Sequence, residues 1–166
     1  PFTNELQVFG LSGAETINTY VEIFNPSGSL LVRLDLGQTA GRIPVESGWR
    51  FWDSLTSPGP VWQLPDFDDS AWLAGTARFG WGLDGENTTL TEGRITQYFR
   101  RWFNVADPSL LTELVFGLVR DDGAVVYLNG REIFRDNLPS GLVTYNSLAT
   151  NAIGGADETT PLEVTL

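Results

Sequence analysis

Residues 123–135 read GAVVYLNGREIFR and carry the clearest fold signal in the chain. Two runs rich in β-branched and aromatic residues flank Asn129-Gly130. This dipeptide favours a two-residue type I′ turn because both positions accept a positive φ angle. The pattern predicts a β-hairpin with two largely apolar faces, so we expect the hairpin to lie inside the fold. The predicted cross-strand pairs are Tyr127 with Glu132, Val126 with Ile133 and Val125 with Phe134.

Short apolar runs separated by Gly, Pro, Asn and Asp continue along the chain in both directions from this hairpin. They recur about every 8–12 residues, a spacing typical of all-β sandwiches and barrels, and long helical periodicity is hard to find. We therefore predict an all-β, antiparallel β-sandwich. The expected strands lie at residues 6–10, 19–24, 29–35, 49–53, 76–80, 96–105, 112–120, 123–128, 131–135 and 160–166.

The expected strand at residues 96–105, TQYFRRWFNV, alternates clearly between two faces. Successive side chains of a strand point in opposite directions, so every second residue shares a face. We expect one face to line the core, and it holds Phe99, Arg101, Phe103 and Val105. We expect the other face to meet a second layer or solvent, and it holds Tyr98, Arg100 and Trp102.

The composition narrows the chemistry that the chain can carry. The 166 residues suit one domain, and they include no Cys, His or Lys. These absences exclude a disulfide framework, thiolate and imidazole metal ligands, a His general base and lysine Schiff-base chemistry. The net charge of −11 would repel a phosphate backbone, so we expect no nucleic-acid partner.

The apolar runs are short, and none approaches the roughly 18 residues of a transmembrane helix, so we predict no membrane span. The first ten residues lack the basic and apolar regions of a signal peptide. The chain begins at Pro1 and contains no Met, which favours a piece of a longer protein. An acidic chain without Cys suits a solvated extracellular bacterial module.

An acidic turn at residues 65–72, PDFDDSAW, is a candidate for catalysis or metal binding. Carboxylate catalysis needs two acids held about 5–10 Å apart on separate supports, whereas these acids are neighbours in the chain. We therefore expect a structural turn, in which short polar side chains cap backbone N–H groups and aromatic side chains reach the core. The expected caps are Asp66, Asp68 and Ser70, and the expected anchors are Phe67 and Trp72.

A second acidic turn, Arg120-Asp121-Asp122-Gly123, precedes a strand and poses the same choice. Asp-Asp-Gly is ordinary turn chemistry, and the arginine can pair with these carboxylates or with a neighbouring loop. Calcium is the alternative for both turns because hard cations bind several oxygen ligands. The chain requires no other cofactor, and the calcium candidates are Asp66, Asp68, Asp69, Asp121 and Asp122.

A longer series of motifs is similar to a known kind of module. The series comprises Trp62, FDDSAW at 67–72, FGWG at 79–82, YFRRWF at 98–103, DDGAVVYLNGREIFRDNLP at 121–139 and GGADET at 154–159. Together these motifs resemble a galactose-binding-like β-sandwich, or jelly roll. That module recurs in large secreted bacterial proteins beside phosphoesterase, lamin-tail-like and spore-coat-kinase-like domains. FDDSAW and VVYLNG also resemble the non-catalytic sandwich domain of family-2 glycoside hydrolases.

The resemblance implies a domain at residues 48–166, preceded by a β-rich N-terminal extension at residues 1–47. It implies an extracellular or cell-surface setting rather than a reaction, and it places FDDSAW at a structural corner. Two positions depart from the family pattern, which usually has Tyr at Trp81 and a small or polar residue at Trp102. The family also continues beyond LEVTL into another strand, so we expect the N-terminal strands to complete the sandwich.

The first functional hypothesis is a non-catalytic module that binds carbohydrate or another extracellular ligand. Sugars stack on aromatic faces and bind a few polar groups, which requires neither His nor Lys. Trp102 is the first candidate because its position in the strand directs it away from the core, and Trp81 is the second because it borders a long loop. Tyr98 and Arg100 share a face with Trp102 and complete the candidate platform.

The second hypothesis is a structural subunit of an extracellular filament or surface assembly that exchanges strands between chains. A sandwich without its last strand leaves backbone groups unpaired, and such an edge is a template for strand addition. We favour exchange between chains over closure within one chain because residues 25–28 and 37–44 have the composition of joints.

The third hypothesis is a carboxylate-based hydrolase, and we rank it below the two non-catalytic hypotheses. Polar loops expected at residues 84–94 and 146–160 could carry a site on a β scaffold. Each candidate acid also has an explanation as a turn residue. These acids are Asp68, Asp69, Asp84, Glu86, Asp121 and Asp122.

Overall fold

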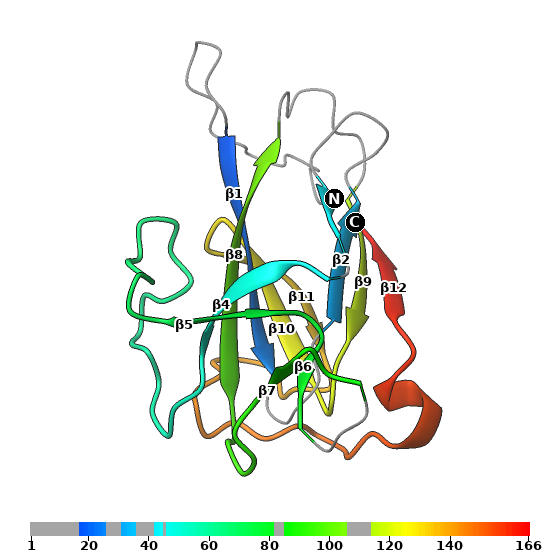
Figure 1. Cartoon of the computed structure of the whole chain (residues 1–166). Coiled ribbons are helices and arrows are strands. Elements are labelled where there is room, and N and C mark those ends of the chain that lie inside the picture. The colour runs from blue at the N-terminus through cyan, green and yellow to red at the C-terminus, as the bar shows by residue number, and fades with distance from the viewer. Residues whose placement is uncertain (1–16, 26–30, 36–41, 45, 82–84, 106–113) are drawn as a thin grey trace.

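The computed structural model describes residues 17–25, 31–35, 42–44, 46–81, 85–105 and 114–166 (Figure 1). Three predictions fall wholly or largely outside these ranges. They are the strand at residues 6–10, the candidate acid Asp84 and the greater part of the two expected joints at 25–28 and 37–44.

The chain is all-β, as the sequence predicts, and the described residues include no α-helix. One short 3₁₀ helix, Gly155–Glu158, lies within the loop expected at residues 146–160. The strands are β1 (Ile17–Asn25), β2 (Leu31–Asp35), β3 (Arg42–Ile43), β4 (Gly48–Trp52), β5 (Leu73–Thr76), β6 (Phe79–Gly80), β7 (Thr88–Thr89), β8 (Gln97–Val105), β9 (Val115–Val119), β10 (Ala124–Leu128), β11 (Arg131–Asp136) and β12 (Leu162–Thr165).

The larger sheet has six antiparallel strands in the order β11-β10-β1-β8-β4-β5. All nine residues of β1 pair with β8, from Ile17 opposite Val105 to Asn25 opposite Gln97. Figure 1 shows the arrows of β1 and β8 pointing in opposite directions, as an antiparallel pair requires. On the other side of β8, Arg50 of β4 pairs with Arg100. This register places the two arginines next to each other on one face of the sheet.

The smaller sheet has four antiparallel strands in the order β12-β9-β2-β3. Strand β12, within the run PLEVTL, lies at its edge and pairs with β9. Strands β6 and β7 form a separate pair, and this pair is parallel. The sequence predicts a single strand at 76–80, whereas β5 ends at Thr76 and β6 begins at Phe79.

The hairpin β10–β11 forms at the predicted turn, where Asn129 and Gly130 have φ angles of 52° and 81°. Tyr127 pairs with Glu132 as predicted, but the next two predicted pairs are wrong because a β-bulge shifts the register. Val126 pairs with Phe134 and Val125 with Arg135, so Ile133 is the extra residue. The bulge allows two consecutive residues, Ile133 and Phe134, to pack against the same core cluster.

Buried side chains from both sheets form one cluster, which we call the inner cluster. Phe99 and Phe103 of β8 belong to it, as predicted, and so does Phe51 of β4. The smaller sheet contributes Phe116 and Leu118 of β9. The face of the six-stranded sheet that carries Phe99 is its inner face, and the opposite face, which carries Tyr98, is its outer face.

A second cluster, the outer cluster, covers part of the outer face. Tyr98 and Val125 supply its floor from the sheet. Trp62 and Trp72 cover them from the loop between β4 and β5, residues 53–72, which we call the covering loop. The segment after β11 adds Leu138. The predicted second layer therefore exists over Tyr98, and loops rather than strands supply it.

The N-terminal strands lie inside the two sheets. Strand β1 lies between β10 and β8, and β2 lies between β9 and β3. Both strands pair with strands of the same chain, and neither lies beside β12, which is where the sequence predicts that they complete the sandwich.

Across the described residues, we find no helix with the length and apolar character needed to span a membrane.

Candidate functional site

Three outer-face residues of β8 were predicted as a ligand platform, and the structure gives them different environments. Tyr98 and Arg100 are buried, with exposed fractions of 2% and 0%, whereas Trp102 is 44% exposed. A sugar can stack only on an aromatic face that it can reach. Of these three predicted residues, only Trp102 is accessible to a ligand.

Arg100 fastens the covering loop to the sheet. Its Nε donates to Asp69 Oδ2 at 2.9 Å, and its Nη1 donates to the carbonyl oxygens of Trp62 and Leu64. Its guanidinium carbon also lies 5.2 Å from the centre of the Phe67 ring. Buried charges are tolerated when they are paired and hydrogen-bonded, and Arg100 meets both conditions. Its role is structural, which corrects its assignment to the platform.

Tyr98 is enclosed by aromatic side chains. The Trp62 ring centre lies 4.8 Å from the Tyr98 ring centre, and the two rings meet edge to face. Burial raises the pKa of the Tyr98 phenol to about 12, because the charged phenolate would lose its hydration. Tyr98 belongs to the outer cluster, and its assignment to the platform is corrected for the same reason.

Beside Trp102 lies an open groove of about 550 Å³ on the six-stranded sheet. It is lined by residues 48–50 of β4, 74–76 of β5 and 100–102 of β8. We call it the β4–β5–β8 groove. The covering loop ends where β5 begins, at Leu73. Each strand contributes consecutive residues, which alternate between the two faces of the sheet. The lining therefore includes Trp102, which is exposed, and Arg101, which the alternation of β8 places on the same side as Phe99.

Two arginines give the β4–β5–β8 groove a cationic character. Arg50 Nη1 donates to the Trp72 carbonyl oxygen at 3.2 Å, and Arg101 Nη1 donates to the Gly48 carbonyl oxygen. Within the described part of the chain, neither guanidinium forms an ion pair with a carboxylate. Partial burial lowers the pKa of the Arg101 guanidinium below its ordinary value. Arginine nevertheless remains charged at neutral pH.

Trp81 does not join Trp102. It is partly buried against the inner cluster, and it is not among the residues that line the β4–β5–β8 groove. Its indole therefore contributes to the core, while Trp102 lies on the outer face. The two predicted tryptophans do not form one platform.

In the acidic turn of PDFDDSAW, Asp68 caps a backbone N–H as predicted, whereas Ser70, another expected cap, supplies that N–H. Asp68 Oδ1 accepts the Ser70 N–H at 2.9 Å, and this hydrogen bond holds the pKa of Asp68 below its ordinary value. Trp72 is 5% exposed in the outer cluster, and Phe67 packs beside it. Asp69 has a role that the sequence did not reveal, since its carboxylate neutralises Arg100. Asp66 is exposed.

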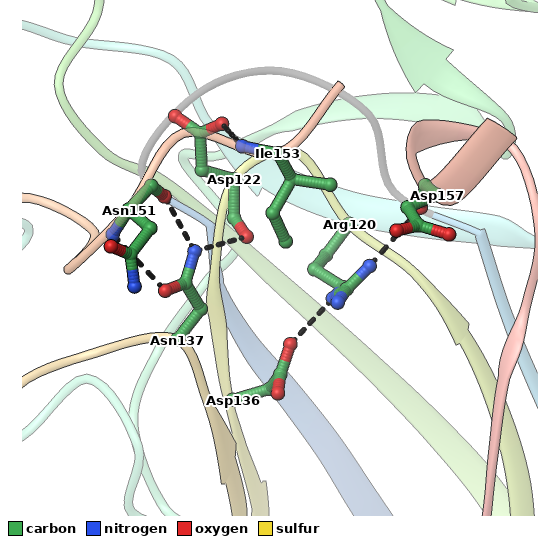
Figure 2. A network of polar contacts seen from close by, with 7 residues as sticks. All are labelled: Arg120, Asp122, Asp136, Asn137, Asn151, Ile153 and Asp157. Atoms are coloured by element: carbon green, nitrogen blue, oxygen red, sulfur yellow. Dashed lines mark hydrogen bonds and ion pairs between the residues drawn. The ribbon is translucent and has the colours of Figure 1, made fainter. Parts of the chain in front are cut away.

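The turn at residues 120–123 connects two strands to the long C-terminal loop (Figure 2). Arg120 Nε pairs with Asp136 Oδ2 at 2.6 Å, and its Nη1 donates to the Asp157 carbonyl oxygen at 3.1 Å. Asp122 Oδ1 accepts the Ile153 N–H at 2.7 Å. The contact with Asp157 is the predicted pairing with a neighbouring loop, whereas the carboxylate partner is Asp136 of β11 and not an acid of the turn itself.

Asn137 occupies the centre of the same network (Figure 2). Its Nδ2 donates to the carbonyl oxygens of Asp122 and Asn151, at 3.1 and 2.6 Å. Its Oδ1 accepts the Asn151 N–H at 3.2 Å, and its φ angle is +53°, a conformation that Asn tolerates better than most residues. One amide side chain therefore ties the turn before β10 to the loop that follows residue 146.

The five calcium candidates do not assemble into a site. The two acidic turns hold Asp66, Asp68 and Asp69, and Asp121 and Asp122, respectively. Over the ranges that the structure covers, no three Asp or Glu side chains gather in a way that could hold a metal ion. Calcium takes six to eight oxygen ligands, which can include backbone carbonyls and waters, so a calcium site at either turn stays a prediction. Glu86, a candidate acid of the hydrolase hypothesis, is partly buried in the loop after β6.

The chain matches no protein-family model, and no curated protein or solved structure is significantly similar to it. The β4–β5–β8 groove must therefore be interpreted from its own residues.

Sequence reasoning missed Arg50 and Thr76 as residues of this groove. The signal was present for Arg50, because alternation in GWRFW places it opposite Trp49 and Phe51, which are core residues. There was no comparable signal for Thr76 in the sequence. The strand was expected to begin at this residue and run to residue 80, whereas β5 ends there.

Proposed function

We propose that this chain is a non-catalytic β-sandwich module of the galactose-binding-like, jelly-roll kind, and that it binds carbohydrate in the β4–β5–β8 groove. The proposal depends on one observation, the 44% exposed Trp102 on a groove formed by three adjacent strands. An exposed tryptophan presents a large rigid face at a small cost in conformational entropy, which suits stacking against the C–H surface of a sugar.

The polar groups of the groove support the same ligand class. Arg50 and Arg101 supply hydrogen-bond donors, and Thr76 supplies a hydroxyl that both donates and accepts. The groove is open, so it suits a segment of a polysaccharide better than a single enclosed sugar. Among the described residues, Arg50 and Arg101 have no carboxylate partner, so we expect sugars that carry a carboxylate to bind more tightly than neutral sugars.

The contacts of the acidic side chains favour binding over hydrolysis. Asp69 is committed to Arg100, Asp68 to the Ser70 N–H and Asp122 to the Ile153 N–H. A general acid and base would need two carboxylates facing a substrate from opposite sides. The extracellular, bacterial and adhesive setting of the proposal comes from the resemblance of FDDSAW and VVYLNG to secreted sandwich modules.

A glycan array that contains neutral and uronate oligosaccharides tests the proposal directly. We expect binding by the parent chain and a loss of about 10-fold or more in Trp102→Ala, by analogy with the 1–3 kcal/mol measured for bases stacked on aromatics. Trp102→Phe should recover part of the affinity because it restores an aromatic face.

Leu142→Ala is a matched control, since Leu142 is 91% exposed and does not line the groove. This variant should bind as the parent does. If the parent bound no glycan, the proposed function would be wrong. Unchanged binding by Trp102→Ala would move the site away from the groove.

A further inference from the structure

Residues 17–35 supply an interior strand to both sheets. Strand β1 lies between β10 and β8 in the six-stranded sheet, and β2 lies between β9 and β3 in the four-stranded sheet. An interior strand has hydrogen-bonded neighbours on both sides. One segment near the N-terminus therefore completes the backbone hydrogen bonding of two separate sheets.

Strands β1 and β2 are consecutive in the chain but do not pair with each other. The strand partners of β1 are β8 and β10, and those of β2 are β3 and β9. All four partners begin at or after residue 42. Every strand that pairs with β1 or β2 therefore comes from the part of the chain that follows them.

Without this segment, four strands would each have an unpaired side. These strands are β8, β10, β9 and β3, and the open side of β8 alone spans nine paired positions. Buried backbone groups without partners cost free energy, and an open strand edge is a template for another strand. The body of the chain therefore requires a β1–β2 segment, whichever chain supplies it.

We propose that residues 17–35 are exchanged between copies of this chain, so that each body receives β1 and β2 from a second copy. Exchange preserves every pairing in the sheets, because the donated segment is identical and keeps the same register. The tether raises the local concentration of the segment within its own chain, so a rising protein concentration shifts the balance towards exchange. Reciprocal exchange gives a dimer, and head-to-tail exchange gives a filament.

Two single-cysteine variants test the proposal, because the parent chain contains no cysteine. Asn18 of β1 pairs with Asn104 of β8. Directly opposed residues of antiparallel strands have Cα atoms about 4.5–5.5 Å apart, which a disulfide can bridge. Asn18→Cys and Asn104→Cys, each with a tag of different mass, are unfolded together, refolded and oxidised. A disulfide between the two variants places β1 of one chain beside β8 of another.

We expect covalent heterodimers on a non-reducing gel, several-fold more abundant than the homodimers of either variant alone and increasing with concentration. The double variant Asn18→Cys/Asn104→Cys should give dimers or a ladder as well as monomers with an internal disulfide. Heterodimers no more abundant than homodimers, together with only internal disulfides in the double variant, would overturn the proposal.

Light scattering on the unmodified chain gives a second measurement that does not depend on the variants. A molar mass that rises from that of one chain to that of two or more as the protein concentration increases supports exchange. A short tether gives an effective concentration of about 1 mM, so exchange should be seen as the protein concentration approaches that value. The mass of a single chain at every concentration up to about 1 mM contradicts exchange. Neither measurement involves Trp102, so this inference and the proposed sugar site can fail separately.

Discussion

Tyr98 and Trp102 lie on the same face of β8, yet one is enclosed and the other is exposed. The sheet beneath them is continuous, and both side chains point away from the inner cluster. The difference comes from the covering loop, which places Trp62 against Tyr98 and does not bury Trp102. On this face, a loop that is not part of the sheet decides which aromatic residue becomes core and which remains available to a ligand.

The covering loop is itself held by the face that it covers. Arg100 bonds Asp69 and two loop carbonyl oxygens, and Arg50 bonds the Trp72 carbonyl oxygen. These two arginines are cross-strand neighbours. These two arginines therefore mark where the covering loop ends on the outer face and the β4–β5–β8 groove begins. Both bind the covering loop, and both are among the residues that line the groove.

Trp72→Ala should have the largest effect on stability, and it tests whether the covering loop packs on the outer face. Removing this buried indole should lower the free energy of unfolding by about 3–5 kcal/mol, the range expected for a core aromatic residue. Urea denaturation, with the m-value compared between parent and variant, measures the loss. An unchanged midpoint would mean that the covering loop does not pack on Tyr98 in solution.

Asp69→Ala tests the attachment of the covering loop. The substitution leaves the buried Arg100 guanidinium without its carboxylate, and we expect a loss of about 3 kcal/mol. Asp66→Ala is the matched control, because it removes an equal charge from an exposed position of the same turn. Equal midpoints for the two variants would contradict a structural role for Asp69.

Alkaline unfolding tests the burial of Tyr98. Its pKa is about 12 in the folded chain and its ordinary value is 10.0, so the folded state favours the neutral phenol. This stabilisation is complete below pH 10 and is lost as the pH rises through 12. Between these values the parent should lose about 2 kcal/mol more than Tyr98→Phe, as measured by urea midpoints. Identical pH profiles would place Tyr98 in water.

Gly130→Ala tests the contact between the hairpin turn and the covering loop. A Cβ atom at Gly130 would lie 3.3 Å from both the Gln63 carbonyl oxygen and Leu64 Cδ2, whereas one at Gly141 would meet nothing within 4 Å. Both glycines have positive φ angles, so each substitution should cost about 1 kcal/mol of backbone strain. Thermal melts should show a larger loss for Gly130→Ala than for Gly141→Ala, and equal losses would exclude the contact.

Trp102→Ala should have a much smaller effect on stability than Trp72→Ala. The Trp102 side chain is 44% exposed, against 5% for Trp72, so less apolar surface leaves the folded state, and we expect a loss of about 1 kcal/mol in the same urea assay. A loss comparable to that of Trp72→Ala would mean that Trp102 is a core residue. The difference in exposure between Tyr98 and Trp102 would then be wrong.

Local patterns predicted the strands and their faces well. Alternation in TQYFRRWFNV assigned Phe99 and Phe103 to the core and Trp102 to the opposite face. Asn129-Gly130 located the hairpin turn because its requirement for positive φ is encoded in two residues. Features of this kind depend on neighbours in the chain, which a single sequence displays.

Features that depend on distant segments were harder to predict. The burial of Arg100 requires Asp69 and the carbonyl oxygens of Trp62 and Leu64, and no local pattern reveals this long-range contact. The bulge at Ile133 has a similar origin, since packing of two consecutive side chains on the inner cluster outweighed regular pairing. The groove could be predicted only in part, because its β5 wall comes from a strand whose bounds were misplaced.

The interior position of β1 has a consequence for the order of events during synthesis. Residues 17–25 are translated before their partners at 97–105 and 124–128, by roughly 5–20 s at typical rates of elongation. Until then β1 lacks both of the strands that lie beside it in the sheet. Long-range pairing of this kind is slow, so β1 is made before its partners and must wait for them to reach its place in the sheet.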